Sequence, residues 1–240
     1  MVTRTEAILV ILIVAGNWSC AGRIPLLGGL DNGEVEFRQR QAMQYFLQAK
    51  VFEAKKDFHG AIVALRNAAD LDPTATIYAQ LARNYEKIQD DRMALVFARK
   101  SVNIDSRQVG LRYLALRVYR RSGQRAEAAK EIEELLEIEP ANWRLYFRLV
   151  HLYIETDQAK KIGPLFGRAL KRSDTPPEVR VNIAYILSRI GNYKKAESVF
   201  REVVQTHPQV ENAWLGLAEV QIVQGRKEEG VQHYRNAARA

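Results

Sequence analysis

One helical unit recurs along almost the whole sequence. Its clearest copy, residues 185–208, contains an apolar helical face, a break at Gly191 and Asn192, a second apolar face and a closing proline. The residue that opens the second face recurs at steps of 33, 34, 34, 34 and 34 residues, as Ala61, Ala94, Ala128, Ile162, Ala196 and Gly230. A period near 34 with two helices per unit indicates an array in which each unit buries its apolar face against its neighbours. The pattern therefore predicts an all-α superhelical solenoid of about six helix–turn–helix repeats.

From about Glu34 to its end, the chain resembles the tetratricopeptide-repeat family, whose motif the repeats match in register. The fifth repeat carries Ile183 and Ala184 in its first helix, Ala196 and Phe200 in its second, and then Pro208. Small residues let the two helices approach, and large ones fill the groove between neighbouring pairs. The resemblance implies an array over residues 34–240, with repeats at about 34–74, 75–107, 108–141, 142–175, 176–209 and 210–240.

Glycines and departures from the motif add two expectations. Gly123, Gly191 and Gly225 stand at one position of their repeats, where a left-handed residue would end the first helix. The third and fourth repeats depart from the motif at Arg112, Leu116 and Ile162, and we expect partner recognition in these less regular repeats.

The sixth repeat reaches Ala240 without an added polar helix, so its end is weakly capped, pairs with another molecule, or belongs to a longer array.

Residues 1–20 are typical of an export signal. Arg4 and the terminal amine form a positive start, residues 7–16 are apolar and uncharged, and small residues follow at positions 19–21. A membrane-spanning helix needs about 20 predominantly apolar residues, which this run does not reach. We therefore expect an exported protein of the periplasm or cell envelope, with residues 21–33 as a glycine-rich linker before the repeats.

Cys20 comes shortly after the apolar run and resembles the lipidated cysteine of bacterial lipoproteins. Ser19 fits that pattern, whereas Asn17 and Trp18 depart from it. Lipidation of Cys20 with anchoring to a membrane, and ordinary signal-peptidase cleavage near residues 19–22, both remain open.

The amino-acid composition limits which partners and which kinds of chemical site the chain can have. The net charge is +8 and the pI is near 9.6, which favours acidic protein segments, anionic polymers, nucleic acid or anionic lipid as partners. One cysteine excludes an intramolecular disulfide and a cysteine-based zinc site. The histidines, His59, His151, His207 and His233, fall in separate repeats without metal-ligand spacing, and we find no catalytic motif. We therefore expect no enzymatic activity, no cofactor and no bound metal.

The family resemblance implies that the first helix of each repeat lines a concave groove. The ninth motif position, which points into it, carries Lys50, Arg83, Arg117, His151, Tyr185 and Glu219 in turn. The third repeat also has an arginine-rich first helix beside a second helix, residues 126–139, with six glutamates and one lysine. This segregation is explained either by salt bridges between the two helices or by a basic partner-binding surface.

The family's carboxylate clamp, which holds acidic C-terminal peptides, is only half present. Arg144 and Arg148 occupy two of its basic positions, but Ala79 and Leu114 replace a lysine and an asparagine. We instead expect a mixed basic and aromatic site for a carboxylate-bearing segment of a partner protein. Its predicted residues are Lys50, Arg83, Tyr113, Arg117, Arg120, Arg144, Phe147, Arg148, His151, Asn182 and Tyr185.

The sequence thus predicts an exported adaptor, tethered to a membrane, that holds a partner segment for the assembly of an envelope or secretion complex. The alternative is binding of an anionic polymer, such as an acidic polysaccharide, along a basic groove. Nucleic acid is the third candidate partner, because an exported protein would be separated from the nucleic acid of the cell. The oligomeric state stays open.

Overall fold

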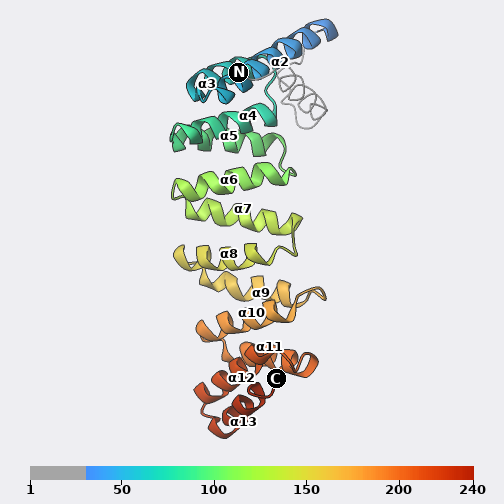
Figure 1. Cartoon of the computed structure of the whole chain (residues 1–240), viewed down its shortest axis with the longest axis vertical. Coiled ribbons are helices and arrows are strands. Elements are labelled where there is room, and N and C mark those ends of the chain that lie inside the picture. The colour runs from blue at the N-terminus through green and yellow to red at the C-terminus, as the bar shows by residue number, and fades with distance from the viewer. Residues whose placement is uncertain (1–30) are drawn as a thin grey trace. The chain divides into compact units, whose positions relative to one another are not determined.

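The computed structural model describes residues 31–240 (Figure 1). The predicted signal, Cys20 and most of the predicted linker lie outside the described residues. Within residues 31–240 there is no strand, and the helices follow one another in pairs. The predicted all-α repeat architecture is therefore confirmed.

Twelve α-helices and one short 3-10 helix account for the regular structure of residues 31–240. In chain order they are α2 (Asn32–Ala54), α3 (Phe58–Leu71), α4 (Ala75–Lys87), α5 (Asp91–Ile104), α6 (Val109–Arg121), α7 (Arg125–Ile138), α8 (Trp143–Glu155), η1 (Ala159–Lys161), α9 (Ile162–Leu170), α10 (Pro177–Arg189), α11 (Tyr193–Thr206), α12 (Glu211–Val223) and α13 (Lys227–Ala237).

The chain divides into two compact units, one ending at Ile138 and the other running from Glu139 to Ala240. In the first, helix α2 packs on α3, α4 on α5 and α6 on α7, and the pairs stack through α3 on α4 and α5 on α6. In the second, α10 packs on α11 and α12 on α13, and α11 stacks on α12. Each unit therefore buries its core between consecutive helix pairs.

Short polar side chains fix where several helices begin. The Asp31 carboxylate accepts a hydrogen bond from the Glu34 amide at 2.7 Å, so α2 begins at Asn32, two residues inside the segment expected to be linker. Asp57, Asp90 and Asn192 cap α3, α5 and α11 in the same way. Such caps satisfy amide groups that have no partner within the helix.

The turn inside every helix pair contains a left-handed residue at the same register. Gly123, Gly191 and Gly225 have φ values of 71°, 81° and 84°, as predicted. The other three pairs place Lys56, Gln89 and Asp157 there, with φ values of 60°, 63° and 54°. A left-handed backbone is unfavourable for residues with a Cβ. The packing of the helix pair therefore imposes this turn even where the sequence does not supply glycine.

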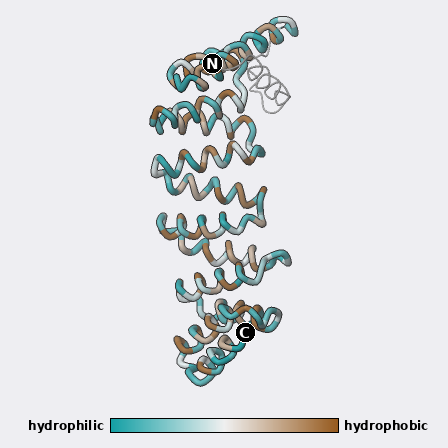
Figure 2. The backbone as a smooth tube through the Cα atoms, in the orientation of Figure 1, coloured by the Kyte–Doolittle hydropathy of each residue, from teal (hydrophilic) through white to brown (hydrophobic). Residues whose placement is uncertain are grey.

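Buried side chains occur at equivalent positions of the repeats and form the core. Apolar and polar residues alternate along each helix (Figure 2), and the large side chains of Leu65, Ile132, Phe166 and Phe200 are fully buried. Leu116 and Ile162, two departures from the motif, are also buried, with exposed fractions of 2% and 0%. These departures are core substitutions, so a partner that binds the third or fourth repeat must contact other residues. Within residues 31–240, no helix has the length and apolar character required to cross a bilayer.

Arg112, the third departure, is buried between the helices of its own pair. Its guanidinium donates to Glu131 and to Glu134, each at 3.1 Å, and to the Ser106 carbonyl at 2.6 Å. Burial raises the pKa of Glu131, and the charge of Arg112 opposes that shift. For this arginine, the explanation by salt bridges between α6 and α7 is confirmed.

Candidate functional site

In the first unit, acids of the chain already engage two of the predicted groove cations. The Lys50 ammonium lies 2.8 Å from Glu53 Oε2, and Glu53 Oε1 accepts a hydrogen bond from the Asn84 amide at 2.6 Å. Arg117 donates two hydrogen bonds to the Glu86 carboxylate, at 2.9 and 2.7 Å, and these raise the pKa of Arg117. A ligand at Lys50 or Arg117 would therefore compete with an existing ion pair.

The other predicted residues of the first unit differ in exposure. Arg83 on α4 and Arg120 on α6 are exposed, whereas Tyr113 on α6 is half-buried. Arg121, next to Arg120, lies 2.8 Å from the Asp91 carboxylate. The arginine-rich helix α6 is thus largely balanced by acids of the same unit.

The second unit presents a different surface on α8. Arg144, Phe147, Arg148 and His151 line one hollow of about 570 Å³, as residues spaced by three or four along a helix share a face. Arg144 and Arg148 are exposed, and neither forms an ion pair within residues 31–240. The His151 ring lies 3.5 Å from the Glu155 carboxylate and is 74% exposed. This face carries two guanidinium groups with unused hydrogen-bond donors.

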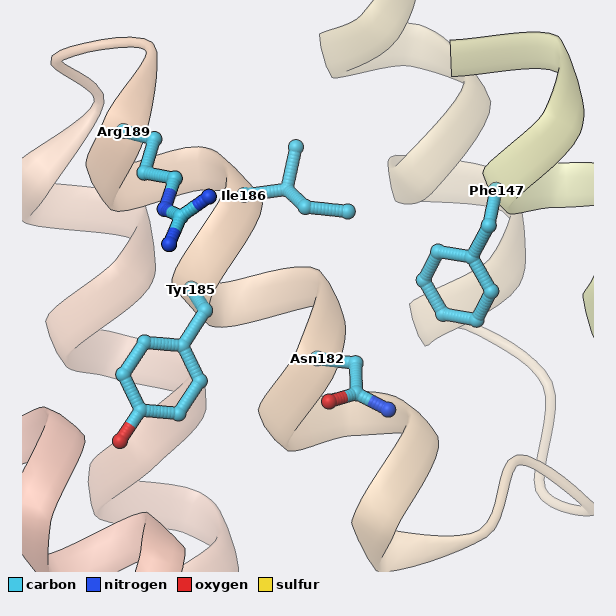
Figure 3. A pocket seen from close by; sticks show the side chains of 5 residues that line it. All are labelled: Phe147, Asn182, Tyr185, Ile186 and Arg189. Atoms are coloured by element: carbon cyan, nitrogen blue, oxygen red, sulfur yellow. The ribbon is translucent and has the colours of Figure 1, made fainter. Parts of the chain in front are cut away.

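Phe147 also borders a second hollow, of about 250 Å³, between α8 and α10. Figure 3 shows Ile186 and Asn182 of α10 pointing toward the Phe147 ring across this gap. Arg189 lies one turn further along α10 and lines the same hollow. The two hollows share Phe147, so cationic and apolar features of the second unit are contiguous.

Tyr185 contributes less to this surface than its motif position suggests. Its hydroxyl donates to the Asn212 carbonyl at 3.1 Å, and its ring meets Phe200 edge-on with centroids 5.1 Å apart. Burial, with a smaller effect of the nearby Glu219 charge, raises the pKa of Tyr185 to about 12. Tyr185 therefore ties α10 to its neighbours and offers only part of its side chain to the hollow.

The structure brings together about half of the predicted site. Arg144, Phe147, Arg148 and His151 share one hollow, and Phe147, Asn182 and Tyr185 share the other. The remaining predicted residues, Lys50, Arg83, Tyr113, Arg117 and Arg120, belong to the first unit. The sequence interpretation missed Ile186, although its spacing of four residues from Asn182 places both on one helix face.

This surface offers guanidinium hydrogen-bond donors beside an aromatic ring. Among residues 31–240 no cluster of three or more histidine, cysteine, aspartate or glutamate side chains could hold a metal ion. Two exposed guanidinium groups beside an aromatic ring can bind carboxylates through charge-assisted hydrogen bonds and hold an apolar side chain nearby.

Comparison with known proteins agrees with the repeat pattern. Two family models, each described as "Tetratricopeptide repeat", match residues 109–142 and 189–239. The chain contains tetratricopeptide repeats. Tetratricopeptide repeat protein 7B of Homo sapiens is 32% identical over 114 residues, which are 46% of this chain and 13% of that protein. The chain thus matches only a small part of this curated relative.

Two solved tetratricopeptide-repeat proteins are among the structures to which this chain is similar. One is YrrB, described as having an unusual peptide-binding site, with 22% identity, a TM-score of 0.48, and coverage of 72% of this chain and 90% of that chain. The other, from Parabacteroides merdae, has 16% identity, a TM-score of 0.48, and coverage of 81% of this chain and 77% of that chain. Tetratricopeptide repeats are protein-interaction scaffolds and are generally not enzymes.

Proposed function

We propose that this chain is an adaptor whose second unit binds an acidic segment of a partner protein. The observation that carries the proposal is the pair of exposed arginines, Arg144 and Arg148, on the same face of α8 as Phe147. We call the surface formed by Arg144, Phe147, Arg148, Asn182 and Ile186 the α8–α10 surface.

This surface suits a segment with both charge and apolar character. Each guanidinium can hold a carboxylate with two parallel hydrogen bonds. Phe147 and Ile186, on opposite sides of the smaller hollow, offer apolar contact to one side chain of the segment. The partner is therefore a protein segment with at least one carboxylate close to an apolar residue.

The ion pairs of the first unit favour a segment over an anionic polymer. A polymer would follow a long run of unpaired cations, whereas Glu53 and Glu86 engage Lys50 and Arg117. Arg83 and Arg120 remain exposed there. Unused guanidinium donors beside an apolar hollow occur together on the α8–α10 surface.

We expect peptides selected from a random library on this protein to combine an acidic and an apolar residue. Replacing Arg144 and Arg148 together by alanine should weaken such a peptide at least about tenfold, since a hydrogen bond to a charged group is worth about 1.5–3 kcal/mol. Titration calorimetry on the intact chain measures the change, and thermal unfolding should be unaltered because both side chains are exposed. The matched control is Lys194→Ala with Lys195→Ala on α11, which removes two exposed cations elsewhere in the unit.

Two results would contradict the proposal. Equal peptide affinity in the arginine variant and in the control would show that α8 is not the site. Tight binding of an acidic polysaccharide, with an affinity that Phe147→Ala leaves unchanged, would favour the polymer instead.

We further propose that the protein is exported and held at a membrane through Cys20. The apolar run at residues 7–16 and its position shortly before Ser19 and Cys20 support this proposal. In the native host, Cys20→Ala should move the protein from the membrane fraction to the soluble fraction, and the mass of the mature N-terminus should show a lipidated Cys20. An unprocessed N-terminus, or unchanged fractionation of the variant, would rule lipidation out.

A further inference from the structure

Arg189 places a third guanidinium group at the edge of the α8–α10 surface. It is exposed in the last turn of α10, and within residues 31–240 it forms no hydrogen bond and no ion pair. It lines the hollow of about 250 Å³ that Phe147 and Ile186 also border. Figure 3 shows Arg189 extending from α10 beside Ile186. Arg189 therefore offers free hydrogen-bond donors next to the apolar part of this surface.

The arginines of α8 and Arg189 lie at different levels along the helices. The 34-residue period makes Arg148 of α8 equivalent to Asn182 of α10, and Arg189 follows Asn182 by seven residues. Seven residues of an α-helix rise by about 10 Å. Ile186 lies between these two levels on α10. The cationic groups are therefore found on both sides of the apolar contact.

The opposite end of the same α10 face is acidic. Glu178 and Arg189 lie eight residues before and three residues after Ile186, so all three share one side of the helix. Glu178 is exposed, and its charge disfavours a second acid at that end. Arg180, also on α10, is already engaged by a carboxylate of α11 at 2.9 Å and by two backbone carbonyls. On α10, an anionic group is therefore favoured near Arg189.

We propose that Arg189 is a second acid-binding group of the α8–α10 surface, so that the partner segment carries acidic residues on both sides of its apolar residue. This proposal rests on the proposed function and specifies its ligand. A segment that fills the hollow removes water from the Arg189 guanidinium, which is unfavourable unless an acceptor of the segment replaces that water. A carboxylate is the acceptor that matches a guanidinium best.

The geometry suits an extended segment. Such a segment rises about 3.3 Å per residue and presents every second side chain to the same face. An acid, an apolar residue and an acid at alternate positions therefore span about 13 Å. This length allows the apolar side chain to enter the hollow between Phe147 and Ile186, with one acid at the arginines of α8 and the other at Arg189.

The test uses peptides selected on the intact chain from a random library and synthesised with both termini blocked, so that side chains supply every carboxylate. We expect the selected peptides to carry an acid, an apolar residue and an acid at alternate positions. Arg189→Gln should weaken the tightest of them at least about tenfold in titration calorimetry, since hydrogen bonds to a charged group are lost. Lys195→Gln, which removes an exposed cation of α11, is the matched control and should leave the affinity unchanged.

Two further peptides, each with one acid replaced by glutamine, assign each acid to its arginine. When the acid held by Arg189 is replaced, Arg189→Gln should cause no further loss, whereas Arg144→Ala with Arg148→Ala should still weaken binding. Replacement of the other acid should reverse this pattern, because such cycles isolate the interaction between two groups.

The outcomes separate this inference from the proposed function. Peptides with a single acid, or an affinity lowered by Arg144→Ala with Arg148→Ala but not by Arg189→Gln, would overturn the role of Arg189 and leave the proposed function in place. An equal loss in Arg189→Gln and Lys195→Gln would show an effect of net charge and would also overturn that role. An affinity unchanged in both arginine variants would overturn the role of Arg189 and the proposed function together.

Discussion

Replacing Gly216 with alanine is expected to lower the free energy of unfolding by about 1–3 kcal/mol. In an ordinary helix interior the same change raises stability by up to about 1 kcal/mol. A Cβ atom at Gly216 in α12, however, would lie 2.2 Å from Phe200 Cζ and 2.4 and 2.8 Å from the two Cε atoms. Phe200 is fully buried and cannot move aside cheaply. Equilibrium denaturation by urea measures the loss.

The steric explanation is tested by removing the ring of Phe200. Phe200→Ala alone should cost about 3–5 kcal/mol, because it leaves a cavity. In that background Gly216→Ala should no longer be destabilising, since the added methyl group enters the space that the ring occupied. The matched control is Gly167→Ala in α9, where no atom lies within 4 Å of the added Cβ and stability should rise. An equal cost of Gly216→Ala in both backgrounds would contradict the steric explanation.

The sequence predicts the helix pairs well because their cause is local and repeated. Ala61, Ala94, Ala128 and Ala196 are all fully buried, as their shared register requires. The left-handed turns at Gly123, Gly191 and Gly225 follow from the same register. Gln89 occupies an equivalent turn without a local signal, and only the repeat period could have located it.

The site is less predictable because its electrostatics depends on packing between repeats. Lys50 and Glu53 are three residues apart on one helix, so their pairing could have been anticipated. The Arg117–Glu86 pair joins residues 31 positions apart, on the first helices of consecutive pairs. The hydrogen bond between Asn84 and Glu53 spans the same 31 positions. Such pairs require the offset between stacked helices, which a repeat motif does not specify at side-chain resolution.

Replacing Arg112 with methionine should lower the free energy of unfolding by about 3 kcal/mol at neutral pH. Arg112 is 8% exposed, and its partner Glu131 has a side chain that is 14% exposed. Removal of one partner leaves the other charge buried without compensation, which costs about 3–5 kcal/mol for a fully buried pair. The second acid, Glu134, is 61% exposed and can be solvated by water. Urea denaturation of the wild type and the variant measures the difference.

The pH dependence distinguishes a lost charge partner from a simple packing defect. Burial raises the pKa of Glu131 above its ordinary value of 4.5, and Arg112 is the first charge that opposes this shift. Without Arg112 the folded-state pKa rises further above the unfolded value, so the charged form costs stability at every pH above the folded-state pKa. The deficit should shrink as the pH falls through that pKa, and its electrostatic part should vanish below about pH 4.5. Glu131→Gln in the Arg112→Met background should recover much of the loss at neutral pH, and a deficit that is the same at pH 7 and pH 4.5 would show that Arg112 acts through packing alone.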